Sequence, residues 1–308
     1  MHVLWVRMHN YHCRKLYQVN PKWSDERLFQ ECRRITIAQF QHITYHEYLA
    51  ILFGPALSAY YDLAVTYGNG YTRYEPYTDP TTWNEYGLAA RYGHSSISSF
   101  MSLMSYGGNS TQYLKYAGRG ATKPGFWLRD WFFNPDLIHD CATDAIVLGL
   151  MTDMSKNVDP WVDGDVHDYL YKAPNEQFGA DLGAANIQRS RDHGTGFYYT
   201  YLDFCFGYKV NSWADLGKFI PQEMLTIFQR VYYHWKDVEL WPAIISERKY
   251  PDADIGPTGA CIAGIQFYHA KFGDRYFYSH GHQSGSMTPG SPFYTSLLFS
   301  DNFLLKLL

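Results

Sequence analysis

The sequence predicts a mainly α-helical protein with long irregular connections. Apolar residues recur three and four positions apart through most of the first 52 residues, and the breaks in this pattern carry helix start and stop signals. The chain has 308 residues, 46% of them hydrophobic, which is enough to bury a sizeable core. A soluble globular protein is therefore expected.

The first expected helix covers residues 3–18. Leu4, Met8 and Tyr11 form one apolar stripe along it, and Asn20 and Pro21 end it.

A second, long helix is expected after Ser24. Ser24 is the predicted N-cap, because Asp25 and Glu26 follow it in the first turn, where the helix dipole favours acids. The apolar pattern continues to Leu52, before Gly54 and Pro55 stop it.

The middle of the chain alternates loops with one further long helix. Residues 64–82 are expected to form a loop, residues 83–104 a helix, and residues 107–125 a glycine-rich connection. That connection contains "GGNST", in which Asn109 is a candidate glycosylation acceptor if the protein is secreted. No internal repeat and no domain linker is evident, so residues 1–308 are expected to form one domain.

Charge and targeting signals exclude several classes of protein. The net charge is −4 and the 26 Lys and Arg are scattered, so neither a nucleic-acid partner nor a polybasic membrane patch is expected. No window is apolar enough for a membrane span. Arg7, His9, His12 and Arg14 interrupt the start of the chain, so no signal peptide is expected there.

The stretch "GAANIQRSRDHGTG", residues 183–196, concentrates polar groups among small neighbours. In a helix, Asn186, Arg189 and His193 would share one face that can position an anion. The alternative is an exposed polar face on which Asp192 pairs with Arg189 or Arg191.

A second cluster lies in "EYGLAARYGHSSISSF", where Arg91 and His94 are three residues apart on a segment of small and apolar residues. A lone histidine there would most simply be a satisfied core residue. The neighbouring arginine argues for a site, because a buried guanidinium needs an anion.

These two stretches resemble the proximal haem pocket of the animal haem peroxidases, the peroxidase and cyclooxygenase superfamily. "RYGH" is followed about ninety residues later by "NIQRSRDHG", and the segments 1–54 and "DIGPTGACIAGIQFYHAKFGDRYFY" are similar to further parts of that family's domain. The similarity runs from residue 1 to about 278, and residues 279–308 diverge. The resemblance implies a helical haem peroxidase-like domain that is incomplete at its N-terminal, distal side.

The resemblance implies roles for four site residues. His94 matches the proximal ligand of haem iron, and Asn186 the amide that accepts a hydrogen bond from its other ring nitrogen. Arg91 and Arg189 match basic residues near the haem propionates. A ligating imidazole needs such an acceptor to fix its tautomer and orientation, and arginine suits carboxylates. Asp192 and His193 are assigned no chemistry, and the "RDHG" end is expected to lock the helix by internal pairing.

The cofactor implied is a b-type haem, and covalent attachment is not expected. Lys172 stands where some relatives have the glutamate that esterifies haem, and Glu176 is displaced from that place. The family's calcium loop, its distal histidine and its distal arginine all belong upstream of the segment with which this chain begins. The sequence also lacks the proline usual after the "RDHG" motif.

Two of the five cysteines match a family disulfide, Cys205 with Cys261, which implies a secreted, extracellular protein. Cys13, Cys32 and Cys141 are unassigned, and Cys32, in a helical apolar row, is expected to be a buried thiol.

The function implied is peroxidase activity: hydrogen peroxide is reduced and small phenolic or halide donors are oxidised at the haem edge. The alternative is a truncated haem-binding or structural relative without turnover. The oligomeric state is open. Without its distal helices the chain is expected to expose apolar surface and to be poorly soluble.

Two other groups of histidines are read as incidental. His42 and His46 are four apart, but Ile43 occupies the position where the zinc pattern requires glutamate, so surface or packing roles are expected. His280 and His282 are expected to lie in a flexible polar tail.

Overall fold

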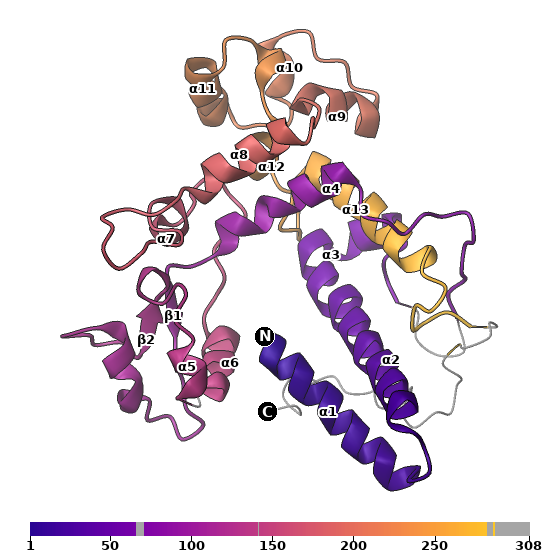
Figure 1. Ribbon diagram of the computed structural model, residues 1–308. Coiled ribbons are helices and arrows are strands. Elements are labelled where there is room, and N and C mark those ends of the chain that lie inside the picture. The colour runs from indigo at the N-terminus through magenta and orange to yellow at the C-terminus, as the bar shows by residue number, and fades with distance from the viewer. Residues whose placement is uncertain (66–70, 141, 282–285, 287–308) are drawn as a thin grey trace. The chain divides into compact units, whose positions relative to one another are not determined.

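The computed structural model describes residues 1–65, 71–140, 142–281 and 286. The chain divides into two compact units. The first contains the described residues up to Thr82 and from Gly264 onward, and the second contains Trp83–Ala263. Helices dominate both units, as the sequence predicted (Figure 1). The expectation of one domain stays a prediction.

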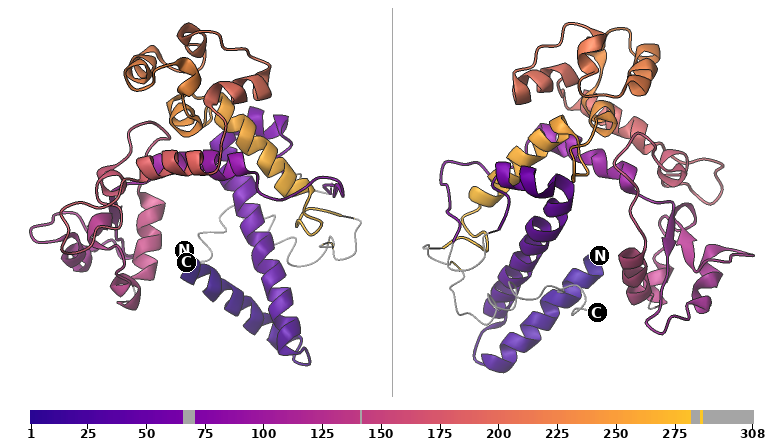
Figure 2. Two further views of the ribbon diagram at one scale, coloured as in Figure 1. Left: turned by 45° about the horizontal axis from the view of Figure 1, so that its top comes forward. Right: turned by 180° about the vertical axis from the view of Figure 1, so that it is seen from behind.

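The first unit begins with a helical hairpin of α1 (His2–Val19) and α2 (Asp25–Ile43). The two helices lie side by side in every view (Figures 1 and 2). Inside the hairpin, His12 Nε2 and Gln39 Oε1 are 2.9 Å apart and buried. Ser24 Oγ accepts a hydrogen bond from Arg27 N at 3.3 Å, which confirms Ser24 as the N-cap. Cys32 is fully buried, as expected.

Past α2 the chain stays helical longer than predicted. A π-helical turn, η1 (Thr44–Tyr48), leads into α3 (Leu49–Tyr60). Gly54 interrupts α3 with φ of 66°, a conformation that glycine adopts without a steric penalty. The helix then resumes at Pro55, whose fixed φ suits a first helical turn. The predicted break is therefore a kink, and the helix ends only at Tyr60.

The prediction of a flexible tail around His280 is wrong. His280 is 1% exposed, and its ring bonds Thr72 Oγ1 at 2.8 Å and the carbonyl of Lys271 at 2.9 Å. Lys271, near the end of α13 (Pro257–Phe272), is itself fully buried and donates to the Asp62 carbonyl. Residues distant in sequence thus enclose the imidazole. His282 and Cys141 lie outside the described residues.

The second unit corrects the predicted helix over 83–104. Only α4 (Asn84–Ala89) is α-helical; a 3₁₀ segment, η2 (Ala90–Ser96), follows. The chain then extends into β1 (Phe100–Ser102), which pairs antiparallel with β2 (Gly125–Trp127). The strand depends on a partner more than twenty residues later, and local periodicity carries no information about that partner.

The connection 107–125 also contains a 3₁₀ segment, η3 (Thr111–Ala117), which was not predicted. Five buried residues form a small core beside the strand pair: Leu103, Phe126, Leu137, Ala142 and Ala145. The remaining elements of this unit are η4 (Leu128–Asp130), α5 (Asp136–His139), α6 (Thr143–Thr152), α7 (Gly164–His167), α8 (Leu182–Asp192), α9 (Tyr198–Phe206), α10 (Trp213–Leu216), α11 (Gln222–Val231), η5 (Trp235–Asp237) and α12 (Leu240–Ser246).

Candidate functional site

The segment η2 carries Arg91 and His94 on one face, because residues three apart eclipse each other in a 3₁₀ helix. Two residues of the segment are buried, and α12 bonds its backbone. Tyr92 is 3% exposed and Ser95 fully buried, and Trp241 Nε1 on α12 donates to the Arg91 carbonyl at 2.9 Å. The backbone of η2 is therefore anchored, and His94 lies half-buried on it.

Asn186 comes from α8, ninety-two residues further along the chain. The helix starts at Asp181, whose side chain accepts from Ala184 N at 3.1 Å. Asn186 is fully buried, and its Oδ1 lies 3.1 Å from His94 Nδ1 and 3.2 Å from Arg91 Nη1. The two stretches that the sequence singled out thus meet at one amide oxygen.

The contact that Arg91 and His94 share with Asn186 Oδ1 determines the tautomer of His94. A guanidinium has only donors, so the Asn186 atom that faces Arg91 must be the oxygen. The same oxygen faces His94 Nδ1, which therefore carries the proton, and the lone pair of the neutral ring is on Nε2. Burial lowers the pKa of His94, the Asn186 bond opposes this, and the nearby charge of Arg91 lowers the pKa further. Burial and the charge of Arg91 together outweigh the Asn186 bond, so the neutral imidazole is favoured.

Two polar atoms at this point are unused. Asn186 Nδ2 is buried and has no hydrogen-bond partner within the described ranges. His94 Nε2 makes no hydrogen bond to any described residue. A free imidazole lone pair with its other nitrogen tied to an acceptor is the arrangement of a metal ligand. In the part of the chain that the structure describes, no three His, Cys, Asp or Glu side chains gather as a metal cluster.

Arg91 and Arg189 lie close enough to affect each other. Burial lowers the pKa of Arg91, and the charge of Arg189 lowers it further. Arg91 also donates from Nε to the Gly87 carbonyl at 3.3 Å, whereas Arg189 is exposed. Two neighbouring guanidinium groups repel each other, and an anion between them would relieve the repulsion.

The "RDHG" end of α8 is held from outside the helix, so the prediction of internal pairing is wrong. Arg191 forms an ion pair with Glu239, with Nε 2.6 Å from Oε1. His193 Nδ1 lies 2.9 Å from Asn84 Oδ1, and Asn84 Nδ2 donates to the His193 carbonyl. Both partners come from segments distant in sequence, the start of α4 and the start of α12.

Lys172 and Glu176 contact each other within one loop. Lys172 Nζ donates to the Glu176 carbonyl at 3.3 Å, and the Glu176 side chain is exposed. This hydrogen bond is a local contact within the loop.

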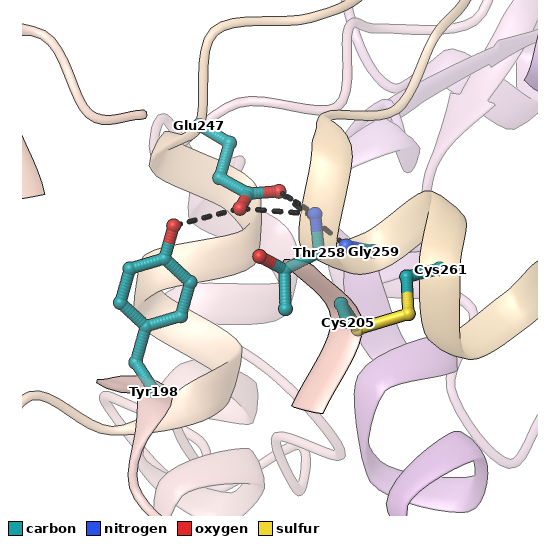
Figure 3. Close-up of a disulfide and its surroundings, with 6 residues drawn as sticks. All are labelled: Tyr198, Cys205, Glu247, Thr258, Gly259 and Cys261. Carbon is teal, nitrogen blue, oxygen red and sulfur yellow. Dashed lines mark hydrogen bonds between the residues drawn. A yellow bond between two sulfur atoms is a disulfide. The ribbon is translucent and has the colours of Figure 1, made fainter. Parts of the chain in front are cut away.

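A disulfide joins Cys205 on α9 to Cys261 on α13, the pair that the resemblance implied (Figure 3). The bridge closes a sequence separation of 56 residues. Cys13 and Cys32 are free thiols.

Beside the disulfide, sequence reasoning missed a buried carboxylate. Glu247 accepts from Tyr198 Oη at 2.7 Å, from Thr258 N at 3.0 and 3.1 Å, and from Gly259 N at 3.4 Å (Figure 3). Burial raises the pKa of Glu247 to about 7, although these donors favour the ionised form. Free backbone N–H groups at the helix start "GPTG" can donate to an acid, but Asp252 and Asp254 lie closer to it in sequence, so no local signal singles out Glu247.

A cavity of about 580 Å³ lies on the same unit between α8, α11 and α12. Its walls include Ala184, Ile187, Trp241 and Phe228. Neither His94 nor Asn186 lines it, so the candidate site lies elsewhere.

His42 and His46, the pair that superficially resembles a zinc pattern, were expected to have surface or packing roles. His42 is buried, and its Nδ1 lies 2.9 Å from Tyr278 Oη. The His46 ring stacks on the His42 ring with centroids 5.0 Å apart, so His42 has a packing role.

Among the described helices, none combines the length and the apolar character needed to cross a bilayer.

Comparison with known proteins places the chain in a family. The model of the animal haem peroxidases matches residues 1–291, beyond residue 278 where the similarity was expected to end. A peroxidase of Drosophila melanogaster is 32% identical over 288 residues, which cover 92% of this chain and 40% of that protein. Lactoperoxidase of Mesocricetus auratus is 30% identical, with 91% of this chain and 38% of that protein covered.

Solved structures of a peroxidase and of a dioxygenase are also similar to this chain. Peroxidase A of Dictyostelium discoideum superposes with a TM-score of 0.74 at 26% identity, covering 96% of this chain and 50% of its own. A fatty acid alpha-dioxygenase of Arabidopsis thaliana reaches a TM-score of 0.74 at 16% identity, a likeness of fold alone. The chain spans about two fifths of the curated relatives' length and half of the solved chains. From the match over residues 1–291, the chain belongs to the animal haem peroxidase family.

Proposed function

We propose that this chain supplies the proximal side of a haem peroxidase, with His94 as the axial ligand of a b-type haem. The observation that carries the proposal is the contact of His94 Nδ1 with Asn186 Oδ1 at 3.1 Å, with Nε2 left free. Bound haem iron would supply the redox chemistry of peroxide reduction. His94, Asn186, Arg91 and Arg189 would hold and orient the haem.

Asn186 orients the ligand and sets its basicity. The amide oxygen accepts the Nδ1 proton and holds it there, so the ring presents Nε2 as a neutral ligand. A neutral amide donates less electron density through the imidazole than a carboxylate in its place would.

Arg91 and Arg189 are proposed to bind the two haem propionates. Carboxylates placed beside both guanidinium groups would offset their mutual repulsion. Arg91 is already held by Asn186 and by the Gly87 carbonyl, so it meets an incoming carboxylate in a defined position.

The whole protein is proposed to reduce hydrogen peroxide and to oxidise small phenolic or halide donors. Moving a proton between the two peroxide oxygens needs a distal base, and the charge that develops needs a cation. A distal histidine, a distal arginine and a calcium loop are proposed to come from a further segment of the protein. The disulfide favours an oxidising, extracellular location.

Haem titration of the full chain tests the axial ligand. His94→Ala is expected to abolish the histidine-ligated Soret spectrum, whereas His193→Ala, at the exposed end of α8, should leave it unchanged. An unaltered spectrum in His94→Ala would refute the assignment.

Sequencing the native transcript upstream of the Met1 codon tests whether the whole protein is a peroxidase. An in-frame segment with a distal histidine and arginine behind a signal peptide supports a secreted peroxidase. A stop codon just upstream would replace it with the alternative, a haem-binding or structural relative without turnover.

A further inference from the structure

We propose that Asn109 carries an N-linked oligosaccharide. Asn109 is the only asparagine of the chain that is followed two positions later by serine or threonine, in "NST". The inference rests on the proposed secretory location and not on haem binding.

The side chain of Asn109 is exposed on a fixed loop between β1 and η3. Ser105 holds that loop from both ends: its Oγ donates to the Asn109 carbonyl at 2.7 Å, and its N donates to Ser110 Oγ at 3.0 Å. Ser110 is buried, so the loop is anchored through its middle residue while the flanking Asn109 and Thr111 face outward. A bulky group on Asn109 therefore meets solvent.

The contacts of Asn109 leave its reactive atom free. Both hydrogen bonds of the side chain end on Oδ1, which accepts from Thr111 N at 3.2 Å and from Thr111 Oγ1 at 2.7 Å. Nδ2, the atom to which a glycan is attached, makes no hydrogen bond to any residue in the described ranges. The third residue of the triplet thus lies directly beside the amide that would be modified.

This turn also has a purely structural reading, since Oδ1 bonds typical of an asparagine turn can start a helix. The asparagine turn and a glycan on the same side chain are compatible. Glycosylation changes Nδ2 and leaves Oδ1 as an acceptor, so the turn that begins η3 survives the modification.

The step needs a lipid-linked oligosaccharide diphosphate and a membrane-bound transferase. A bond forms between Nδ2 of Asn109 and the anomeric carbon of the sugar. The bond from that carbon to the lipid diphosphate breaks, the diphosphate leaves with the bonding electrons, and one amide proton is lost to the transferase. No atom changes oxidation state.

Expression behind a cleavable signal peptide in cultured insect cells tests the site, scoring only chains whose signal peptide has been removed. The wild-type chain should shift in mobility, and a peptide N-glycosidase should reverse the shift and leave aspartate at position 109, detectable by mass spectrometry. Loss of the shift is expected in Asn109→Asp, which keeps the Oδ1 acceptor and the turn but lacks the amide nitrogen. Thr111→Val should also lose it, and Thr111→Ser should keep it.

Asn211→Gln is the matched control, because Asn211 is also exposed and also precedes a serine, but tryptophan occupies the third position. Its glycan shift should equal that of the wild type. An unmodified wild-type chain, or a shift that persists in Asn109→Asp, overturns the inference. Haem binding is measured separately on each protein, so a failure of the proposed function would not be mistaken for a failure of this site.

Discussion

Replacing Glu247 by Gln should remove a pH dependence of stability that the wild-type chain carries. Glu247 is buried and its pKa is raised from an ordinary 4.5 to about 7, chiefly by loss of solvation. The folded state therefore holds the proton more tightly than the unfolded state does. This contribution to stability is fully present below pH 4.5 and is lost as the pH rises through 7.

The magnitude follows from the two pKa values. One pKa unit corresponds to about 1.4 kcal/mol, so the full loss is about 3 kcal/mol. Between pH 5 and pH 8 the free energy of unfolding should fall by about 2 to 3 kcal/mol through this one group.

Gln cannot ionise, so this fall is absent in Glu247→Gln. Gln introduces a constant cost instead, because one end of its amide is a donor that faces the donors Thr258 N or Gly259 N. A donor left without an acceptor costs about 1 to 3 kcal/mol. The variant should therefore be less stable than wild type at pH 5 and should approach or exceed it at pH 8.

Urea unfolding followed by tryptophan fluorescence at several pH values measures the difference between variant and wild type. Taking the difference cancels the groups that both proteins share. Glu223→Gln, at an exposed position on α11 of the same unit, is the control and should show a difference that does not vary with pH. A Glu247→Gln difference that is equally flat from pH 5 to 8 would refute the reasoning.

Three further results are expected. Gly256→Ala should cost about 1 to 3 kcal/mol in urea unfolding, because its Cβ would lie 2.3 Å from the Cβ of the buried glutamate; Gly164→Ala, with nothing within 4 Å, should cost far less, and equal losses would contradict this. The double variant Cys205→Ala, Cys261→Ala should lose about 2 to 4 kcal/mol for a closed loop of this length, and an unchanged urea midpoint would argue against a stabilising bridge. Asn186→Asp should lower the reduction potential of bound haem in spectroelectrochemical titration, since a carboxylate increases electron donation through the ligand; an unchanged potential would remove this amide from the proposed site.

Local signals in the sequence determined the helices whose ends have their own caps. Ser24 starts α2 and Asp181 starts α8 through side-chain bonds to backbone N–H groups three residues away. Such contacts need no distant partner, so Ser24 predicted the start of α2. The apolar stripe alone placed α1 to within a residue at each end, whereas the predicted second helix ran on to Leu52 and α2 ends at Ile43. The segment 83–104 was not, because β1 exists only where Phe100 meets Trp127.

The candidate site shows the same division. Sequence motifs and the family resemblance pointed to His94 and Asn186, and the structure brings their side chains within hydrogen-bond distance. Only the tertiary structure decided that Arg191 pairs with Glu239, that His280 is enclosed, and that Glu247 is buried against a helix start. Each of these depends on a partner or an enclosure formed from distant segments. Helical periodicity reports the neighbours three and four residues away, whereas burial and charge pairing are properties of the packed chain.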